Sequence, residues 1–175
     1  MNQSHHKALA KSPKELCVRG DYIEIRIGRI ILDAKVRSEE IDGEEKLILF
    51  EAVFSNLWDY RIPTYGNDPM LVDSEGFQHT AYDLGFHVTI SESKQIKEGT
   101  KIPRIDNEIE GKARSRGWIA FPPLKKSVVP HRLVFHFYVF DPGCTSGSVR
   151  HSETLELVFD LSLFGRLLEN ARKQN

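Results

Sequence analysis

Apolar and polar residues alternate in short runs along most of this chain. Ile23, Ile25 and Ile27 alternate with Glu24 and Arg26, which is the period of a β-strand with one face toward a core and one toward water. Similar runs, separated by glycine, proline and acidic residues, continue toward the C-terminus. The predicted strands are 22–36, with a bulge near Gly28, and 46–54, 60–63, 70–72, 77–82, 85–90, 114–121, 133–140 and 153–159.

Two of these runs also indicate where the core lies. Residues 46–54 are dense in aliphatic and aromatic side chains, as in a central strand that is covered on both faces. In the run 133–140, one face carries Leu133, Phe135, Phe137 and Val139, because successive side chains of a strand alternate. About nine short strands without alternating helices favour an all-β, antiparallel β-sandwich over an α/β fold.

Two of the turns between predicted strands are marked by an acidic residue and a glycine. Asp42-Gly43 lies at the tip of an acidic segment between two β-rich runs, which indicates a hairpin. In the segment Asp73-Ser-Glu-Gly76, the glycine supplies the positive φ that such a turn requires. The polar and charged residues 91–110 are expected to form a long loop, and neither an internal repeat nor a second core is apparent.

The pattern changes at both ends of the chain. Residues 1–20 are polar and rich in lysine, so we predict a flexible N-terminal arm. Residues 21–160 are predicted to form the sandwich as one domain, a size that folds without disulfides or metals. Residues 161–175 are predicted to form a short C-terminal amphipathic helix, because apolar residues recur there at helical spacing. They are Leu163, Phe164, Leu167, Leu168 and Ala171.

Composition narrows the class of protein. The 175 residues are 40% hydrophobic and 28% charged, with a formal net charge of -1, so the chain is expected to be soluble and nucleic-acid binding is disfavoured. No apolar run approaches the roughly 18 residues of a transmembrane segment. The first residues lack the apolar region of a secretory signal. A cytoplasmic location is expected if the N-terminus is complete, and the cell envelope or secretion if an export segment was removed.

The chain has two cysteines, Cys17 and Cys144, which lie far apart in the sequence. Two free thiols are the expectation for a chain without an export signal. A disulfide between them is the alternative. A zinc site has less support, because neither residue belongs to a Cys-x-x-Cys pair.

Four segments together resemble the DUF4352 family of immunoglobulin-like domains, which are small sandwiches often found in exported bacterial and archaeal proteins. The hairpin Leu-Val-Asp-x-x-Gly and the segment that runs from Gly111 through Gly117-Trp118 to Phe121 carry the resemblance. The matching residues are 47–63, 70–78, 110–121 and 133–137, within the stretch from Ile30 to Phe140. The resemblance implies an immunoglobulin-like fold. It implies no activity, because the family has no shared catalytic residues.

No motif for catalysis stands out, since the chain has no Gly-x-Ser-x-Gly elbow and no His-x-x-x-His spacing. We therefore expect a protein that is not an enzyme and needs no cofactor. Loop carboxylates are a speculative site for a hard cation, namely Asp73, Glu75, Asp106 and Glu108. The alternative at the first of these is an ordinary turn, in which Asp73 and Ser74 bond their own backbone.

Aromatic residues on predicted loops suggest a binding surface. Trp58, Tyr60 and Tyr65 lie where a protein-binding rim would use them, and packing into the fold is the alternative. Trp118 is in a predicted strand and is expected in the core. These features predict a non-catalytic immunoglobulin-like module that binds another protein or itself. The alternative is a small-ligand or divalent-metal-binding domain that uses the acidic loops and the scattered histidines.

Overall fold

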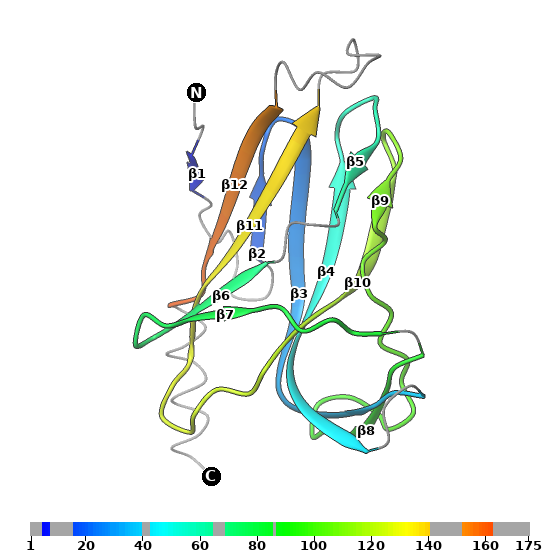
Figure 1. The fold of residues 1–175 in the computed structure, drawn as a ribbon, viewed down its shortest axis with the longest axis vertical. Helices are drawn as coiled ribbons and strands as arrows, with labels where there is room; N and C mark the ends of the chain where they lie inside the picture. The colour runs from blue at the N-terminus through cyan, green and yellow to red at the C-terminus, as the bar shows by residue number, and fades with distance from the viewer. Residues whose placement is uncertain are drawn as a thin grey trace.

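The protein folds into two stacked β-sheets, each of five strands within the residues described, and a separate two-stranded ribbon (Figure 1). The computed structural model describes residues 5–7, 16–39, 43–64, 69–85, 87–140 and 152–162, of which 5–7, 138–140 and 152–155 are described by backbone only. Every named element in these residues is a strand. The strands are β1 (His5–Lys7), β2 (Leu16–Arg19), β3 (Ile23–Arg37), β4 (Glu44–Asn56), β5 (Ile62–Pro63), β6 (Met70–Asp73), β7 (Gln78–Thr80), β8 (Thr89–Glu92), β9 (Glu108–Ile109), β10 (Arg114–Phe121), β11 (Pro130–Phe140) and β12 (Ser152–Asp160).

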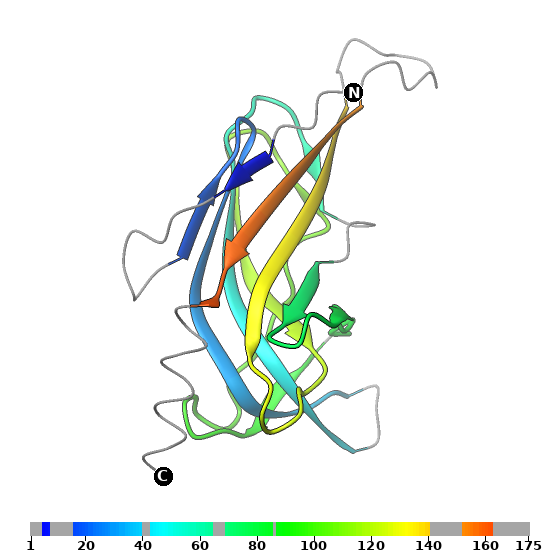
Figure 2. The same cartoon turned by 90° about the vertical axis from the view of Figure 1, so that its left-hand side faces the viewer.

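The first sheet has the order β1-β12-β11-β6-β7, and the second has the order β10-β4-β3-β2, with β8 also paired to β3. All pairs are antiparallel except β1 with β12. Figure 2 shows the β11–β12 hairpin of the first sheet lying against the long β3–β4 hairpin of the second. The predicted all-β, antiparallel sandwich is thus confirmed.

The main core fills the space between the two sheets. Phe54 of the second sheet meets Phe135 and Phe137 of the first edge-on, with ring centroids 5.5 and 5.9 Å apart. Leu133, Phe135 and Phe137 are all buried in this core, as the alternation predicted, and the side chain of Val139 lies outside the described residues. Strand β4 is buried on both faces over most of its length, which confirms that it is a central strand.

A second apolar cluster covers part of the outer face of the second sheet. Ile96 and Ile102, from the segment that follows β8, pack there with Leu49 and Trp118. This differs from the prediction of a single core and a polar loop over 91–110. The sequence pattern missed the cluster because its apolar residues are isolated among charged ones and follow no period. Trp118 itself is buried, as predicted.

An ionic cluster borders this second core. Glu51 faces outward from β4 but is only 7% exposed, because Arg116 donates two hydrogen bonds to its Oε1 at 2.6 and 3.0 Å and Arg29 donates to its Oε2. The guanidinium of Arg29 lies 5.0 Å from the ring centroid of Trp118. The hydrogen bond from Arg29 lowers the pKa of Glu51 against the effect of burial.

The prediction of a flexible arm over residues 1–20 is wrong where the structure describes them. β2 pairs with β3, and its Leu16 and Val18 are buried in the main core. β1 pairs in parallel with β12. Short apolar alternation inside a lysine-rich segment was too brief to signal a strand. Apart from Leu161 and Ser162, the helix predicted over 161–175 lies outside the described residues.

The predicted hairpin, the predicted turn at Gly76 and the predicted bulge are confirmed, and Asp42 lies outside the described residues. β3 and β4 form a hairpin, and their register shifts between Ile27 and Ile30, beside Gly28. β6 and β7 pair across the turn that contains Gly76, whose φ is 88°. No helix in the described part of the chain has the length and apolar character needed to cross a membrane.

Candidate interaction surface

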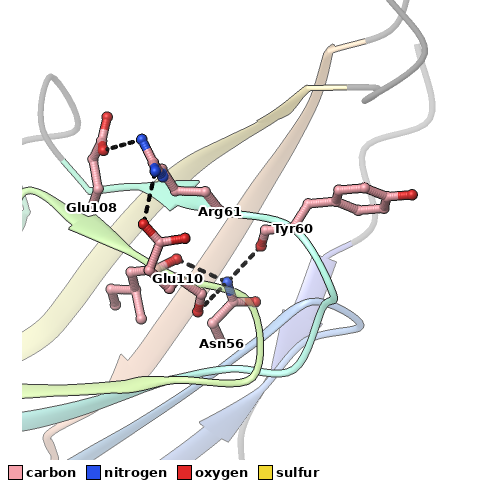
Figure 3. A network of polar contacts seen from close by, with 6 residues as sticks. Asn56, Tyr60, Arg61, Glu108 and Glu110 are labelled. Carbon is pink, nitrogen blue, oxygen red and sulfur yellow. Dashed lines mark hydrogen bonds and ion pairs between the residues drawn. The ribbon is translucent and has the colours of Figure 1, made fainter.

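The loop that follows β4 is organised by one buried amide. Asn56 is 2% exposed, and its Nδ2 donates to the carbonyl oxygens of Tyr60 at 2.7 Å, Ile109 at 3.0 Å and Glu110 at 3.1 Å (Figure 3). Its Oδ1 accepts from the backbone N–H of Trp58 at 2.9 Å. Because the amide has two hydrogens for three acceptors, one of these bonds is shared. A single side chain thus holds residues 56–60 against residues 109–110.

The backbones of the two loops also bond to each other directly. Asn56 N–H donates to the carbonyl of Ala113, and Lys112 N–H donates to that of Trp58, both at 2.9 Å. At Gly111 the approach is so close that a Cβ would lie 2.1 Å from the carbonyl oxygen of Asp59. Any larger residue at this position would push the loops apart.

Three aromatic rings lie in a row on this support. Trp58 contacts Tyr22 and Tyr60, with ring centroids 5.1 and 5.0 Å apart and tilted planes. Trp58 is half-buried against the main core, whereas Tyr60 is 51% exposed. The row therefore ends at the solvent-facing Tyr60. Figure 3 shows the Tyr60 ring pointing away from the hydrogen bonds of Asn56.

The charged side of this surface is the ribbon of β5 and β9. Arg61 pairs with Glu108 at 2.9 Å and with Glu110 at 2.8 Å (Figure 3). The hydrogen bond and the charge of Glu110 raise the pKa of Arg61. These side chains are exposed, so the pairs add little to stability, and they hold the Arg61 guanidinium on the ribbon, on the side away from the Tyr60 ring (Figure 3).

A second loop, the turn between β6 and β7, is also held by a buried side chain. Asp73 is 3% exposed. Its Oδ1 accepts from the backbone N–H groups of Glu75 and Phe77, both at 2.9 Å, and its Oδ2 lies 2.8 Å from Nε2 of His79. The turn displays Phe77, which is 62% exposed.

Burial alone would raise the pKa of Asp73. The hydrogen bonds from His79 and from the backbone N–H groups outweigh that effect, so the pKa lies below its ordinary value. The predicted bonding of Asp73 to its own backbone is confirmed. Ser74 instead bonds another segment, since its Oγ accepts from Val129 N–H at 3.2 Å.

Two of the three predicted partner-binding residues, Trp58 and Tyr60, are in contact, and Tyr65 lies outside the described residues. Three of the four speculative metal ligands bond other protein groups, and the fourth is exposed to solvent. Asp73 is committed to its turn, Asp106 accepts from the Ser115 hydroxyl at 2.7 Å, and Glu108 pairs with Arg61. Glu75 is exposed. No group of three or more His, Cys, Asp or Glu side chains in the described residues is placed to hold a metal ion.

Sequence reasoning assigned no role in this surface to Asn56 and Gly111, the two residues that fix it. Asparagine after a strand is a common turn former, and that local signal covers only its bond to Trp58. Its bonds to Ile109 and Glu110 join residues 53 and 54 positions apart. Only the register of the sheet brings those residues together.

Comparison with known proteins gives little information about function. Neither a protein-family model nor a curated protein matches this chain. Among solved structures, the chain is similar to an uncharacterized β-sandwich protein from Clostridium difficile 630, with 13% sequence identity and a TM-score of 0.39 over 89% of this chain and 96% of that one.

Proposed function

We propose that this protein is a non-catalytic, immunoglobulin-like module that binds another protein, or a second copy of itself, through the surface formed by Trp58 and Tyr60. The observation that carries the proposal is the exposure of Tyr60, at 51%, on a loop that a buried amide holds in place. Preorganised aromatic residues lose little conformational freedom on binding, which favours affinity.

The residue types support this proposal. Tyrosine and tryptophan are among the residues that most often dominate the energy of protein interfaces, and Trp58 and Tyr60 are in contact here. Trp58 is half-buried behind Tyr60, so a partner that covers Tyr60 would contact a ring that is already backed by packed side chains. Well-supported, desolvated contacts of this kind are typical of hot spots.

The connectivity supports the immunoglobulin-like part of the proposal, and with it the resemblance to the DUF4352 family. In the immunoglobulin fold, strands A, B and E are neighbours in one sheet and strands C, F and G in the other. Here β3, β4 and β10 are neighbours in one sheet, and β6, β11 and β12 in the other. In chain order, β3, β4, β6, β10, β11 and β12 thus correspond to strands A, B, C, E, F and G.

Affinity capture from a lysate of the source organism tests the proposal, with retained proteins identified by mass spectrometry. The baits are the native chain, Tyr60→Ser, and Phe77→Ser as a matched control, because Phe77 is also an exposed aromatic residue, on another loop. We expect a stoichiometric partner that the native chain and Phe77→Ser retain and Tyr60→Ser loses, with unchanged melting temperatures. Retention of nothing, or equal retention by Tyr60→Ser, would contradict the proposal.

Self-association is the second form of the same proposal. If the partner is another copy of this chain, the sedimentation coefficient of the native protein will rise with concentration, and that of Tyr60→Ser will stay constant. A rise in both would place the contact elsewhere on the molecule.

A further inference from the structure

Exposed arginine side chains lie on the outer face of the second sheet, next to the second core. The strands β2, β3, β4 and β10 lie side by side in this sheet (Figure 1). Val18, Ile25 and Ile119 point into the main core, so the residues that alternate with them point outward. Arg29 follows the bulge in β3 and pairs with the outward-facing Glu51. The five arginines, which we call the arginine face, are Arg19, Arg26, Arg29, Arg114 and Arg116.

The arginine face carries an excess of positive charge. In the part of the sheet that the structure describes, its carboxylates are Glu24 and Glu51, whose side chains are only 12% and 9% exposed. Each lies between two arginines, so it can neutralise only one of them. The side chain of Arg114 has no ion pair or hydrogen bond within the described residues. Arg29, Arg114 and Arg116 therefore have one carboxylate among them, that of Glu51, and this imbalance favours an anionic partner.

Two of these guanidinium groups are held in place from below. Arg116 donates from Nε and Nη2 to Oε1 of Glu51 at 3.0 and 2.6 Å, and Arg29 donates from Nε to Oε2. The Arg29 guanidinium also lies over the ring of Trp118, 5.0 Å from its centroid. A guanidinium has five N–H groups, so both heads keep terminal N–H groups for a further acceptor. Side chains that are already ordered lose little freedom when a partner binds.

The three arginines follow one strand. Arg114 and Arg116 are two residues apart on β10, and the next outward position, Trp118, lies under the Arg29 guanidinium. An antiparallel strand advances about 3.4 Å per residue, so outward positions recur about every 6.8 Å. Alternate side chains of any extended peptide have the same repeat. A peptide with carboxylates at alternate positions can therefore meet all three arginines at once.

The arginine face does not offer what a nucleic acid would use. Single-stranded nucleic acids stack their bases on exposed aromatic rings. In the described residues, the exposed large hydrophobic side chains are Tyr60 and Phe77, and neither belongs to a strand of this sheet. The formal net charge of the whole chain is -1, so a long polyanion would be repelled by the rest of the molecule. A short peptide contacts the arginine face alone.

We propose that the arginine face binds an extended acidic peptide, with carboxylates at alternate positions paired to Arg114, Arg116 and Arg29. Arginine suits this partner, because its planar fork of N–H groups can bond both oxygens of one carboxylate. The arginine face does not include Trp58 or Tyr60. The proposal is therefore independent of the proposed function and can fail or succeed without it.

Four fluorescent probes test the chemistry and the spacing of the partner. They are a peptide of four Glu-Ser repeats, one of four glutamates followed by four serines, one of four Lys-Ser repeats, and a pentathymidylate, whose four phosphates match the charge of the glutamate peptides. Fluorescence anisotropy with the full-length protein at about 50 mM salt, where exposed charges are weakly screened, gives each Kd.

We expect the alternating glutamate peptide to bind best. The block peptide should bind about threefold more weakly, because fewer of its carboxylates lie on one side of the extended chain, and the lysine peptide should not bind. No saturable binding of the alternating peptide at about 1 mM protein, or equal binding of the two glutamate peptides, would overturn the proposal. Tighter binding of the pentathymidylate would also overturn it, in favour of a nucleic-acid surface.

Two arginine variants locate the contact. Arg114→Gln should weaken binding of the alternating peptide about threefold. Arg132→Gln should leave the Kd unchanged, because Arg132 is an exposed arginine of β11, in the other sheet. Both side chains are exposed, so the melting temperatures should not change. An unchanged Kd for Arg114→Gln, or an equal loss for Arg132→Gln, would mean that the arginine face is not the binding site.

Discussion

Two loops of this sandwich each display an exposed aromatic ring, and each is held by one buried side chain of nearly the same shape. Asn56 supports the loop with Tyr60, and Asp73 supports the turn with Phe77. The amide mainly donates, to three carbonyl groups, and two of these belong to a distant segment. The carboxylate only accepts, and all of its partners lie within six residues.

This difference in chemistry has consequences for stability. The Asn56 bonds join two segments of the sandwich, so they are made only when the sheets are in register. The Asp73 bonds close a local turn, whose N–H groups at Glu75 and Phe77 belong to exposed residues. Water can replace the carboxylate in the turn more easily than it can replace the amide between the loops.

Exchange of the two isosteric side chains should show the largest effects. Asn56→Asp removes both donors and directs carboxylate oxygens at three carbonyl groups, so we expect the free energy of unfolding to fall by about 4 kcal/mol. Asp73→Asn keeps the oxygen that accepts from Glu75 and Phe77, and we expect a loss of about 1 kcal/mol. Urea unfolding at pH 7 measures both. Losses of equal size would contradict the distinction between the two loops.

The glycines of the two loops provide a second comparison. Gly111→Ala places a Cβ 2.1 Å from the backbone of Asp59, and we expect a loss of about 2 to 3 kcal/mol because backbone must move. Gly76→Ala meets no atom within 4 Å. Only its φ of 88° disfavours alanine, by about 1 kcal/mol. Thermal unfolding of the two variants tests the order. If Gly76→Ala lost more, conformational strain would outweigh the close approach.

The contrast between local and distant contacts also explains which features could be predicted from the sequence. The turn at Asp73 was predictable because its signal is local: an aspartate, a glycine three residues later and apolar runs on each side. The long strands β4 and β11 were predictable from dense or alternating apolar residues. The anchoring of the loop at Asn56 was not predictable, because two of the carbonyl groups that Asn56 bonds lie more than fifty residues away and no local pattern specifies them.

The second core and β2 were missed for a related reason. Ile96 and Ile102 lie six residues apart among charged side chains, and Leu16 and Val18 form a pair in a lysine-rich segment. Isolated apolar residues such as these become buried only when they pack against a sheet that has already formed. Their burial is therefore a property of the assembled fold, which periodicity along the chain does not report.

Acid titration should give the smallest and most selective difference between the loops. Because the pKa of Asp73 is lowered in the folded protein, its carboxylate adds stability above the unfolded value of about 3.9, and that stability is lost as pH falls through the lower, folded pKa. The pKa of Glu51 is also lowered, so its protonation reduces the free energy of unfolding in acid by the same amount in every variant.

The informative quantity is therefore the difference in unfolding free energy between each variant and the native chain. For Asp73→Asn, which has no carboxylate to protonate, this difference should be largest near pH 6 and shrink as pH falls below about 4. For Asn56→Ala it should stay constant over the same range, because an amide does not titrate. Urea unfolding at several pH values between 6 and 2.5 measures both. A constant difference for Asp73→Asn would mean that the carboxylate has the same pKa in the folded and unfolded chain, and that the turn is held by its shape and not by its charge.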